Sequence, residues 1–378
     1  MYKYFIPPII LLFCVMNVFA GNTSIIMHGM VNTDSGTITL IPIGSDIYYP
    51  DRNSPFVTQV MNKRFSFTNN ATYPLAFQLG LKNGSRLIYL SDIFFVCPGF
   101  QNILCNKDSA WEVPKLTNYC MTEYKNTFKN EFIDIETEHQ KVNEKFKCLS
   151  IEFKSKIPQE ISLEIQKEYN VLTHKKDSIL FQYAKKHPNS YVALWELIDK
   201  FTTLGYKPVY DSTYTQLSNK IKNTFTGKML AKKLYAANVT SVGSIFPKLL
   251  ISDSKKTIVF NSAISHKKYT LIDFWFSHCG ACIGQFDDLK NIYALYKDKG
   301  FTIVGISIDG KDKIEDWKNV IDQYLLPWKQ YLDFNGEECN KLSIESFPSN
   351  FLINEQGKII AKRISPNELS KFLETHLP

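Results

Sequence analysis

Two cysteines separated by two residues, Cys279 and Cys282, have the types and spacing to exchange disulfides. They end the run LIDFWFSHCGAC at 271–282. Zinc ribbons and copper carriers use the same spacing, so the position of the two cysteines in the predicted fold has to distinguish a redox pair from a metal site. The apolar residues before the pair predict a buried strand, and a helix is predicted to begin at about Cys279. Backbone N–H groups and the dipole of such a helix favour a thiolate at Cys279.

The same geometry predicts different roles for the two thiols. Cys282 lies one turn further into the helix and is expected to be the more buried, so Cys279 attacks a substrate disulfide and Cys282 resolves the mixed disulfide. Cys282 must first lose its proton. Asp273 is the candidate acceptor, because it is flanked by apolar residues and burial raises the pKa of a carboxyl group. An aspartate that faces water at the strand end is the alternative.

The elements that would position this pair occupy the last third of the chain. The pattern predicts strands at 256–260, 269–276, 301–308, 350–354 and 358–363, and helices at about 279–297, 312–325 and after Pro366. Gly300 is expected to end the first helix, and residues 355–357 to form a hairpin turn. The strand–helix–strand start requires a right-handed crossover with parallel pairing, to which the closing hairpin adds antiparallel strands.

Two other regions precede this segment. From 21 to 110, short alternating strands separated by turn residues, including 53–55, predict a small antiparallel β domain whose last strand ends at Pro98-Gly99. From 111 to 240 the apolar period lengthens towards 3.6, which predicts a helical connector with Ser190 as an N-cap. We therefore expect a β domain at 21–110, a connector at 111–240 and an α/β domain at 241–378.

Residues 1–20 combine Lys3, an apolar run and a terminal Ala20, the pattern of a secretory signal peptide cleaved after Ala20. This predicts export to the periplasm or cell envelope. An uncleaved anchor is the alternative, which would tether the protein through its N-terminus alone. Lipidation at Cys14 is a minor option, because Phe13 stands where a lipoprotein signal needs a small residue.

Four further cysteines, Cys97, Cys105, Cys120 and Cys148, are spaced too irregularly for a zinc site. In an oxidising compartment they predict one or two structural disulfides, with the pairing open. We assign no role to Cys339. The net charge of +7 arises from interspersed Lys, Arg, Asp and Glu residues, which indicates a solvated surface and no nucleic-acid partner. We expect no cofactor and no metal.

Several motifs in order resemble the thioredoxin fold over roughly residues 240–378. They are the run 271–282 with the helix behind it, GISID at 305–309, and SFPSNFLI at 346–353 followed by Gly357. The branch they most resemble is the exported TlpA/ResA-like thiol-disulfide oxidoreductases. The upstream part is more weakly similar to the β-rich domain of unknown function that precedes such modules in Gram-negative envelope proteins.

This resemblance implies a nucleophile at Cys279, a resolving thiol at Cys282, a buried acid at Asp273 and a cis-proline facing the dithiol at Pro348. The chain departs from the family pattern at three places. His278 replaces the usual Trp, Gly280-Ala281 lacks the usual Pro, and Gln285 stands where a Glu often lies. A protonated His278 would stabilise the thiolate and a neutral one would do little, and both alternatives stay open. Gln285 cannot act as a base.

We therefore expect an exported enzyme that exchanges disulfides with protein substrates, in the reducing direction, and that draws electrons from an upstream donor. One alternative is a Cu(I)-binding protein that uses His278, Cys279 and Cys282. Another is an envelope protein whose β domain binds a partner and whose redox module is vestigial. The sequence leaves open the substrate, the electron donor, the role of the N-terminal domain and the oligomeric state.

Overall fold

The computed structural model describes residues 24–52, 56–108, 112, 114–116, 118–253, 257–260 and 267–377. The chain divides into two compact units, Met1–Glu136 and Thr137–Pro378. The expected signal peptide at 1–20 and the expected turn at 53–55 lie outside the described residues. In the part of the chain that is described, no helix is both long enough and apolar enough to cross a membrane.

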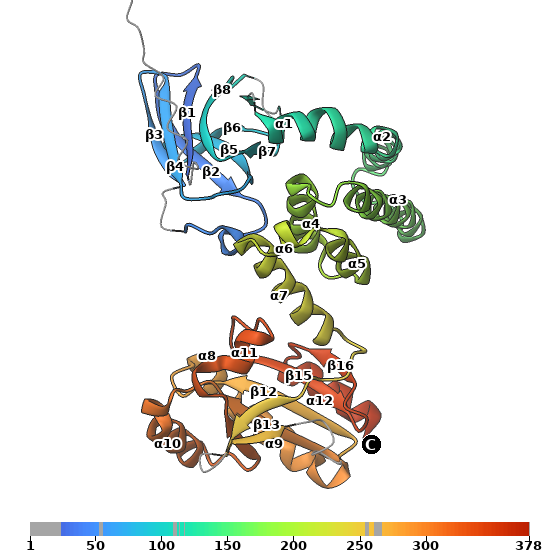
Figure 1. Cartoon of the computed structure of the whole chain (residues 1–378). Coiled ribbons are helices and arrows are strands. Elements are labelled where there is room, and N and C mark those ends of the chain that lie inside the picture. Colours follow the sequence, from blue (N-terminus) through green and yellow to red (C-terminus); the bar gives the residue numbers. More distant parts are fainter. Residues whose placement is uncertain are drawn as a thin grey trace, which may run out of the picture. The chain divides into compact units, whose positions relative to one another are not determined.

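The first unit is built on a nine-stranded β-sheet in the order β6-β5-β2-β3-β4-β1-β8-β9, with β7 paired to β5 (Figure 1). Its strands are β1 (Ile25–Val31), β2 (Ser35–Pro42), β3 (Val57–Met61), β4 (Arg64–Asn69), β5 (Leu75–Asn83), β6 (Arg86–Leu90), β7 (Phe94–Val96), β8 (Gly99–Cys105) and β9 (Lys115–Leu116). Residues of β1 alternate between buried and exposed, as a sheet with one covered face requires.

The predicted β domain is confirmed, but its sheet continues beyond Pro98. Strand β8 begins at Gly99 and pairs with β1 in parallel, whereas β1 pairs with β4 antiparallel. A sequence of short strands and turns suggests hairpins, which are antiparallel. The parallel pair was not evident, because β1 and β8 are separated by most of the domain.

One of the expected disulfides links Cys97, after β7, to Cys120 in helix α1 (Tyr119–Glu123). The other two cysteines of the group are free thiols, with Cys105 buried and Cys148 exposed. Helix α1 continues through a π-helical turn, η2, into α2 (Lys129–Glu152), which crosses the division between the units.

The second unit begins with helices that confirm the predicted helical character of this region. They are α3 (Gln159–Lys186), α4 (Tyr191–Leu204), α5 (Pro208–Gln216), α6 (Asn219–Lys222) and α7 (Phe225–Val239). Ser190 caps α4 as predicted, because its side chain accepts a hydrogen bond from the Ala193 N–H at 3.0 Å. The buried carboxylate of Asp177 is paired with Lys200 at 3.3 Å and with Lys207 at 2.7 Å, as a charge in a helical core must be.

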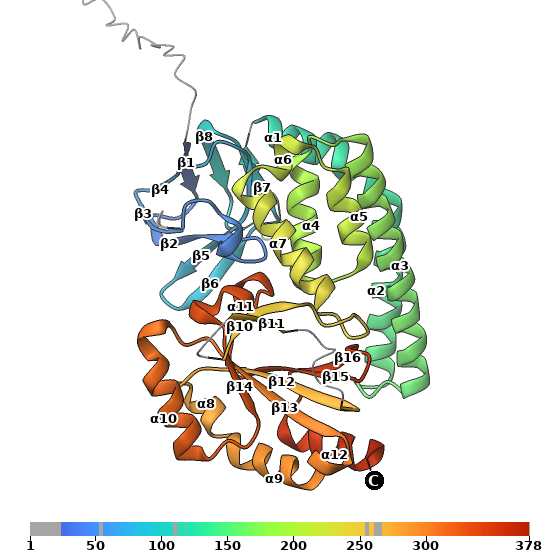
Figure 2. The same ribbon diagram turned by 60° about the horizontal axis from the view of Figure 1, so that its bottom comes forward.

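The C-terminal part of this unit is a seven-stranded sheet in the order β11-β10-β14-β13-β12-β15-β16 (Figure 2). Its strands are β10 (Leu249–Ser252), β11 (Thr257–Phe260), β12 (Tyr269–Trp275), β13 (Phe301–Ser307), β14 (Lys329–Leu332), β15 (Ser349–Asn354) and β16 (Ile359–Lys362). β12 pairs in parallel with β13 and antiparallel with β15, as the sequence predicted. The short strands β10 and β14 were not predicted.

Helices cover both faces of this sheet. Figure 2 shows α9 (Phe286–Tyr296) and α12 (Pro366–His376) on one face and α11 (Glu337–Lys341) on the other. The single helix expected at 279–297 is two helices, because α8 (Gly280–Ile283) stops before α9 begins. The break falls at Gly284 and Gln285, which stay in the right-handed region but have ψ angles of −16° and −10°, closer to zero than the about −42° of a regular α-helix. Helix α10 (Ile314–Tyr324) follows β13.

Candidate active site

Cys279 and Cys282 form a disulfide where the chain passes from β12 into α8. Cys279 is the N-cap residue of α8, and its sulfur accepts a hydrogen bond from the backbone N–H of Cys282 at 3.2 Å. Cys279 is 5% exposed and Cys282 1% exposed. Cys279 is therefore the more accessible member of the pair, and it has the backbone N–H that a thiolate would need.

Asp273 lies in the middle of β12, between Gly305 of β13 and Asn350 of β15. Side chains of a strand alternate between faces, so Asp273 shares the face of Leu271 and Trp275, which belong to the same core cluster as both cysteines. Asp273 is 3% exposed and its Oδ1 has no hydrogen-bond partner among the described residues. Burial raises its pKa to about 7, which is the direction that the sequence predicted.

Pro348 follows a cis peptide bond from Phe347, as the family resemblance implied. The next residue, Ser349, pairs with Phe274 of β12, so the cis bond lies level with the end of β12. The rings of Phe347 and Phe276 meet edge to face, with centroids 5.6 Å apart. This contact joins the loop that carries Pro348 to the loop that leads into the dithiol.

Asp309, which is 6% exposed, is the centre of a hydrogen-bonded group that was not predicted from the sequence. Its Oδ2 accepts from the Ser277 N–H at 2.8 Å and from the Ser307 hydroxyl at 2.6 Å, and its Oδ1 accepts from the Ser277 hydroxyl at 2.8 Å. The signal was available, because Asp309 follows the strand beside β12 and the carboxyl ends of parallel neighbours meet at one edge. Asp309 therefore fixes the loop that precedes Cys279.

His278 points away from the core and is the most exposed member of this group. Its side chain is 63% exposed, with Nδ1 2.9 Å from the Ser277 hydroxyl and Nε2 3.7 Å from Oδ2 of Asp316 in α10. Gln285 lies at the start of α9, where its amide supplies no base. Asp273, which is buried and has a raised pKa, therefore stays the predicted proton acceptor of this site.

Two further features bear on other functions. Among the described residues, no three His, Cys, Asp or Glu side chains are grouped so as to hold a metal ion.

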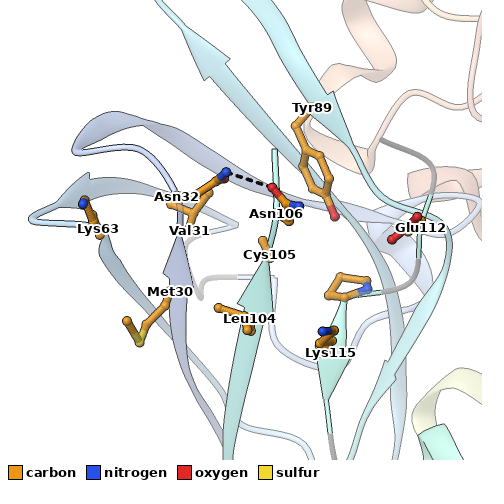
Figure 3. A pocket seen from close by; sticks show the side chains of 11 residues that line it. Met30, Val31, Asn32, Lys63, Tyr89, Leu104, Cys105, Asn106, Glu112 and Lys115 are labelled. Atoms are coloured by element: carbon orange, nitrogen blue, oxygen red, sulfur yellow. Dashed lines mark hydrogen bonds between the residues drawn. The ribbon is translucent and has the colours of Figure 1, made fainter. Parts of the chain in front are cut away.

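In the first unit a cleft of about 570 Å³ opens beside β1, β8 and β9 (Figure 3). Figure 3 shows Asn32 donating to Asn106 across its rim, at 2.8 Å, above the buried Cys105. We assign no chemistry to this cleft.

A central strand that carries a buried acid and leads into a CxxC disulfide at a helix start, with a cis-proline just before the neighbouring strand β15, defines a thioredoxin-like module. Residues 241–375 match the Redoxin family. The chain resembles the thiol-disulfide oxidoreductase ResA of Oceanobacillus iheyensis, with 33% identity over 92 residues, 24% of this chain and 47% of that protein. It resembles ResA of Bacillus thuringiensis subsp. konkukian at 29% identity over 110 residues, 29% of this chain and 62% of that protein.

The chain therefore spans about half to three-fifths of the length of these curated relatives. Among solved structures, the thioredoxin domain of a thiol-disulfide oxidoreductase from Bacteroides vulgatus is 31% identical, with a TM-score of 0.33. That match covers 36% of this chain and 99% of that chain. These matches place the C-terminal module, residues 241–375, in the TlpA/ResA-like family of thioredoxin-fold thiol-disulfide oxidoreductases. The predicted fold class and family are confirmed for this module.

Proposed function

We propose that this protein is an exported oxidoreductase that reduces disulfides in protein substrates through Cys279 and Cys282. The observation that carries the proposal is the disulfide between these residues at the start of α8, on the same face of the sheet as the buried Asp273. In this proposal Cys279, the less buried of the two at 5% exposed, is the attacking sulfur, Cys282 is the resolving sulfur and Asp273 is the proton acceptor, which are the three groups that disulfide exchange requires.

The reaction begins from the reduced dithiol. The Cys279 thiolate attacks one sulfur of the substrate disulfide, so that a new S–S bond joins enzyme and substrate while the other substrate sulfur leaves as a thiolate. The N–H of Cys282 donates to the Cys279 sulfur and the cysteine caps α8, which favours the thiolate over the thiol.

The second step resolves the mixed disulfide. The Cys282 thiol gives its proton to the Asp273 carboxylate, and the resulting thiolate attacks the Cys279 sulfur. The bond to the substrate breaks, its second sulfur leaves as a thiolate, and the disulfide seen in the structure forms. Two electrons have passed from the enzyme dithiol to the substrate, whose thiolates take up one proton from Asp273 and one from water.

Another dithiol must then supply two electrons and two protons to return the enzyme disulfide to its reduced form. The direction of net transfer depends on the reduction potential of the Cys279–Cys282 pair. Equilibration with glutathione measures it. A value near that of thioredoxin, about −270 mV, supports a reductant, and a value near that of strong oxidants, about −120 mV, overturns the proposed direction.

Two observations support export. Residues 1–20 have the pattern of a signal peptide. In addition, Cys97 and Cys120 form a disulfide in the first unit, and disulfides of this kind persist in oxidising compartments such as the periplasm. We place the protein in the periplasm or cell envelope on this basis.

Trapping of the intermediate tests the proposal. The Cys282→Ala variant, incubated reduced with oxidised insulin, should accumulate a mixed disulfide through Cys279, visible on a non-reducing gel and located by mass spectrometry. Cys279→Ala should trap nothing. Cys339→Ala, which removes a buried thiol of α11, is the matched control and should behave as the wild type. If both active-site variants still catalyse insulin reduction by dithiothreitol and neither traps insulin, the proposal is wrong.

A further inference from the structure

The outer face of the sheet in the first unit carries a stripe of exposed apolar side chains on two paired strands. Six outward-facing residues of β1 and β8 form it in pairs: Ile26 with Phe100, His28 with Asn102, and Met30 with Leu104. The four large apolar members are between 36% and 61% exposed. Contiguous exposed apolar residues with polar neighbours are typical of a binding surface. We call these six residues the β1–β8 stripe.

The stripe lies along a groove. All of its residues except Ile26 line a hollow of about 730 Å³, which shares Met30, Leu104 and Lys115 with the cleft shown in Figure 3. The described residues that line this groove include the cations Arg64 and Lys115 and no acidic side chain. The groove therefore combines an apolar floor with positive charge.

One row of the sheet crosses the groove from cation to cation. Met30 of β1 pairs with Arg64 of β4 on one side and with Leu104 of β8 on the other. Leu104 pairs in turn with Lys115 of β9. Neighbouring strands are about 4.8 Å apart, so the backbones that carry the two cations are roughly 14 Å apart. A partner that complements this row is apolar in the middle and negatively charged at both edges.

We propose that the groove on β1 and β8 binds an amphipathic helix of a protein partner, with the apolar side of the helix on the stripe and acidic residues beside Arg64 and Lys115. A helix with its side chains is about 10–12 Å wide, which fits between these two cations. From Ile26 to Met30 the stripe is roughly 13 Å long, which matches about two and a half helical turns. Apolar residues at positions i, i+3, i+4 and i+7 of the helix would lie along it.

Two other occupants match the groove less well. A membrane surface needs apolar side chains that protrude, whereas these side chains line a hollow. A second copy of the same face would bring Arg64 and Lys115 against like charges, because a two-fold interface places one surface patch against itself. The charges therefore favour a partner helix with acidic flanks. This inference concerns the first unit and does not depend on the proposed redox function.

Model peptides and the full-length protein test the inference. One fluorescent helix-forming peptide carries Leu at i, i+3, i+4 and i+7 with Glu on both flanks, and its comparator carries Lys in place of Glu. Fluorescence anisotropy should show the wild type binding the Glu peptide about tenfold more tightly than the Lys peptide. Arg64→Glu/Lys115→Glu should reverse this preference, a gain of binding to the Lys peptide that unfolding cannot produce.

A matched control carries the same change of charge at the other end of the sheet. Lys82→Glu/Arg86→Glu alters exposed residues of β5 and β6 and should keep the preference of the wild type. Equal affinity for the two peptides, or a preference that survives Arg64→Glu/Lys115→Glu, overturns the inference.

Self-association and lipid binding test the other occupants. Sedimentation velocity measures whether the wild type self-associates, and co-sedimentation with phosphatidylglycerol vesicles measures binding to an anionic lipid surface. Neither interaction should depend on Arg64 and Lys115 if the groove holds a partner helix. Self-association or vesicle binding that Arg64→Glu/Lys115→Glu abolishes also overturns the inference, because the groove would then hold a second copy or a membrane surface.

Discussion

The molecule contains two disulfides in different surroundings. Cys97–Cys120 joins the end of β7 to α1 across a sequence separation of 23, whereas Cys279–Cys282 closes a separation of 3 at a strand–helix junction. The first is bordered by neutral amides, since Gln101 accepts from the Cys97 N–H at 3.3 Å and from Asn118 at 2.7 Å. The second shares a sheet face with the ionisable Asp273.

This contrast teaches what distinguishes a disulfide that holds a fold from one that can turn over. The S–S bond is the same in both disulfides. They differ in whether a neighbouring group can accept a proton and in how deeply each sulfur is buried. Amides at Cys97 stabilise one geometry and accept no proton. Around Cys279 the chain provides a helix start that favours a thiolate. It also provides the carboxyl group of Asp273, whose pKa burial raises to about 7, so that this group can both accept and release a proton near neutral pH.

The largest expected effect comes from Cys279→Ala. Without the attacking sulfur, insulin reduction by dithiothreitol should fall to the uncatalysed rate, a loss of roughly 1,000-fold or more. The variant should keep its fold, since it removes one sulfur at the start of α8 and leaves the Cys97–Cys120 disulfide intact. Activity that survives Cys279→Ala and disappears in Cys97→Ala would reverse our assignment of the two disulfides.

The next largest effect is expected from Asp273→Asn, which keeps the shape of the side chain and removes proton transfer. Resolution by Cys282 should slow by roughly tenfold to 100-fold, which is at or below the lower limit of about 100-fold for general bases because a thiol can also ionise unaided. Rapid-quench measurement of the mixed disulfide should therefore show it accumulating in this variant. A wild-type resolution rate would remove Asp273 from the mechanism.

The same variant gives a stability measurement with a definite sign. Between about pH 4 and 7 the unfolded chain has lost the Asp273 proton and the folded protein still holds it, so the free energy of unfolding falls as pH rises through this window. The total is roughly 4 kcal/mol for a pKa raised from 3.8 to about 7. Asp273→Asn lacks this cost, so its stability relative to the wild type should increase from pH 5 to 8 in urea unfolding of the oxidised protein. A pH-independent difference would contradict the buried acid.

A smaller effect on activity, and a large one on stability, is expected from the double variant Cys97→Ala/Cys120→Ala. Closing a loop of this length stabilises a fold by about 3 kcal/mol in the chain-entropy account. Thermal unfolding of the first unit, followed by circular dichroism, should therefore shift down by roughly 10 °C or more. Insulin reduction should stay within about twofold of the wild type. A proportionate loss of activity would show that this disulfide takes part in exchange.

The residues of the candidate redox site could be predicted from the sequence, but the contacts that hold the surrounding loops could not. The strand, the CxxC pair and Asp273 follow a local pattern, so the raised pKa of Asp273 could be predicted from its apolar neighbours. The cis bond at Pro348 came from family resemblance, because a local pattern carries no signal for it. The hydrogen bonds from Ser277 to Asp309 form because two strands that are 26 residues apart end at the same edge of the sheet, which no local pattern shows. The disulfide pairing in the first unit likewise depends on which of Cys97, Cys105 and Cys120 the fold brings together.

The smallest expected effect concerns the free thiols, and it sharpens the contrast between the units. With both disulfides intact, iodoacetamide should label Cys148, which is exposed, and leave Cys105 and Cys339 unlabelled until the protein is denatured. Burial raises the pKa of Cys105 to about 12 and also raises that of Cys339, so the thiolate that reacts is scarce by more than 100-fold. Cys105 would then be a poor attacking group for the Cys97–Cys120 disulfide in its own unit, which keeps that bond from exchanging. Peptide mapping that finds Cys105 labelled as fast as Cys148 would remove this reason for treating the disulfide of the first unit as permanent.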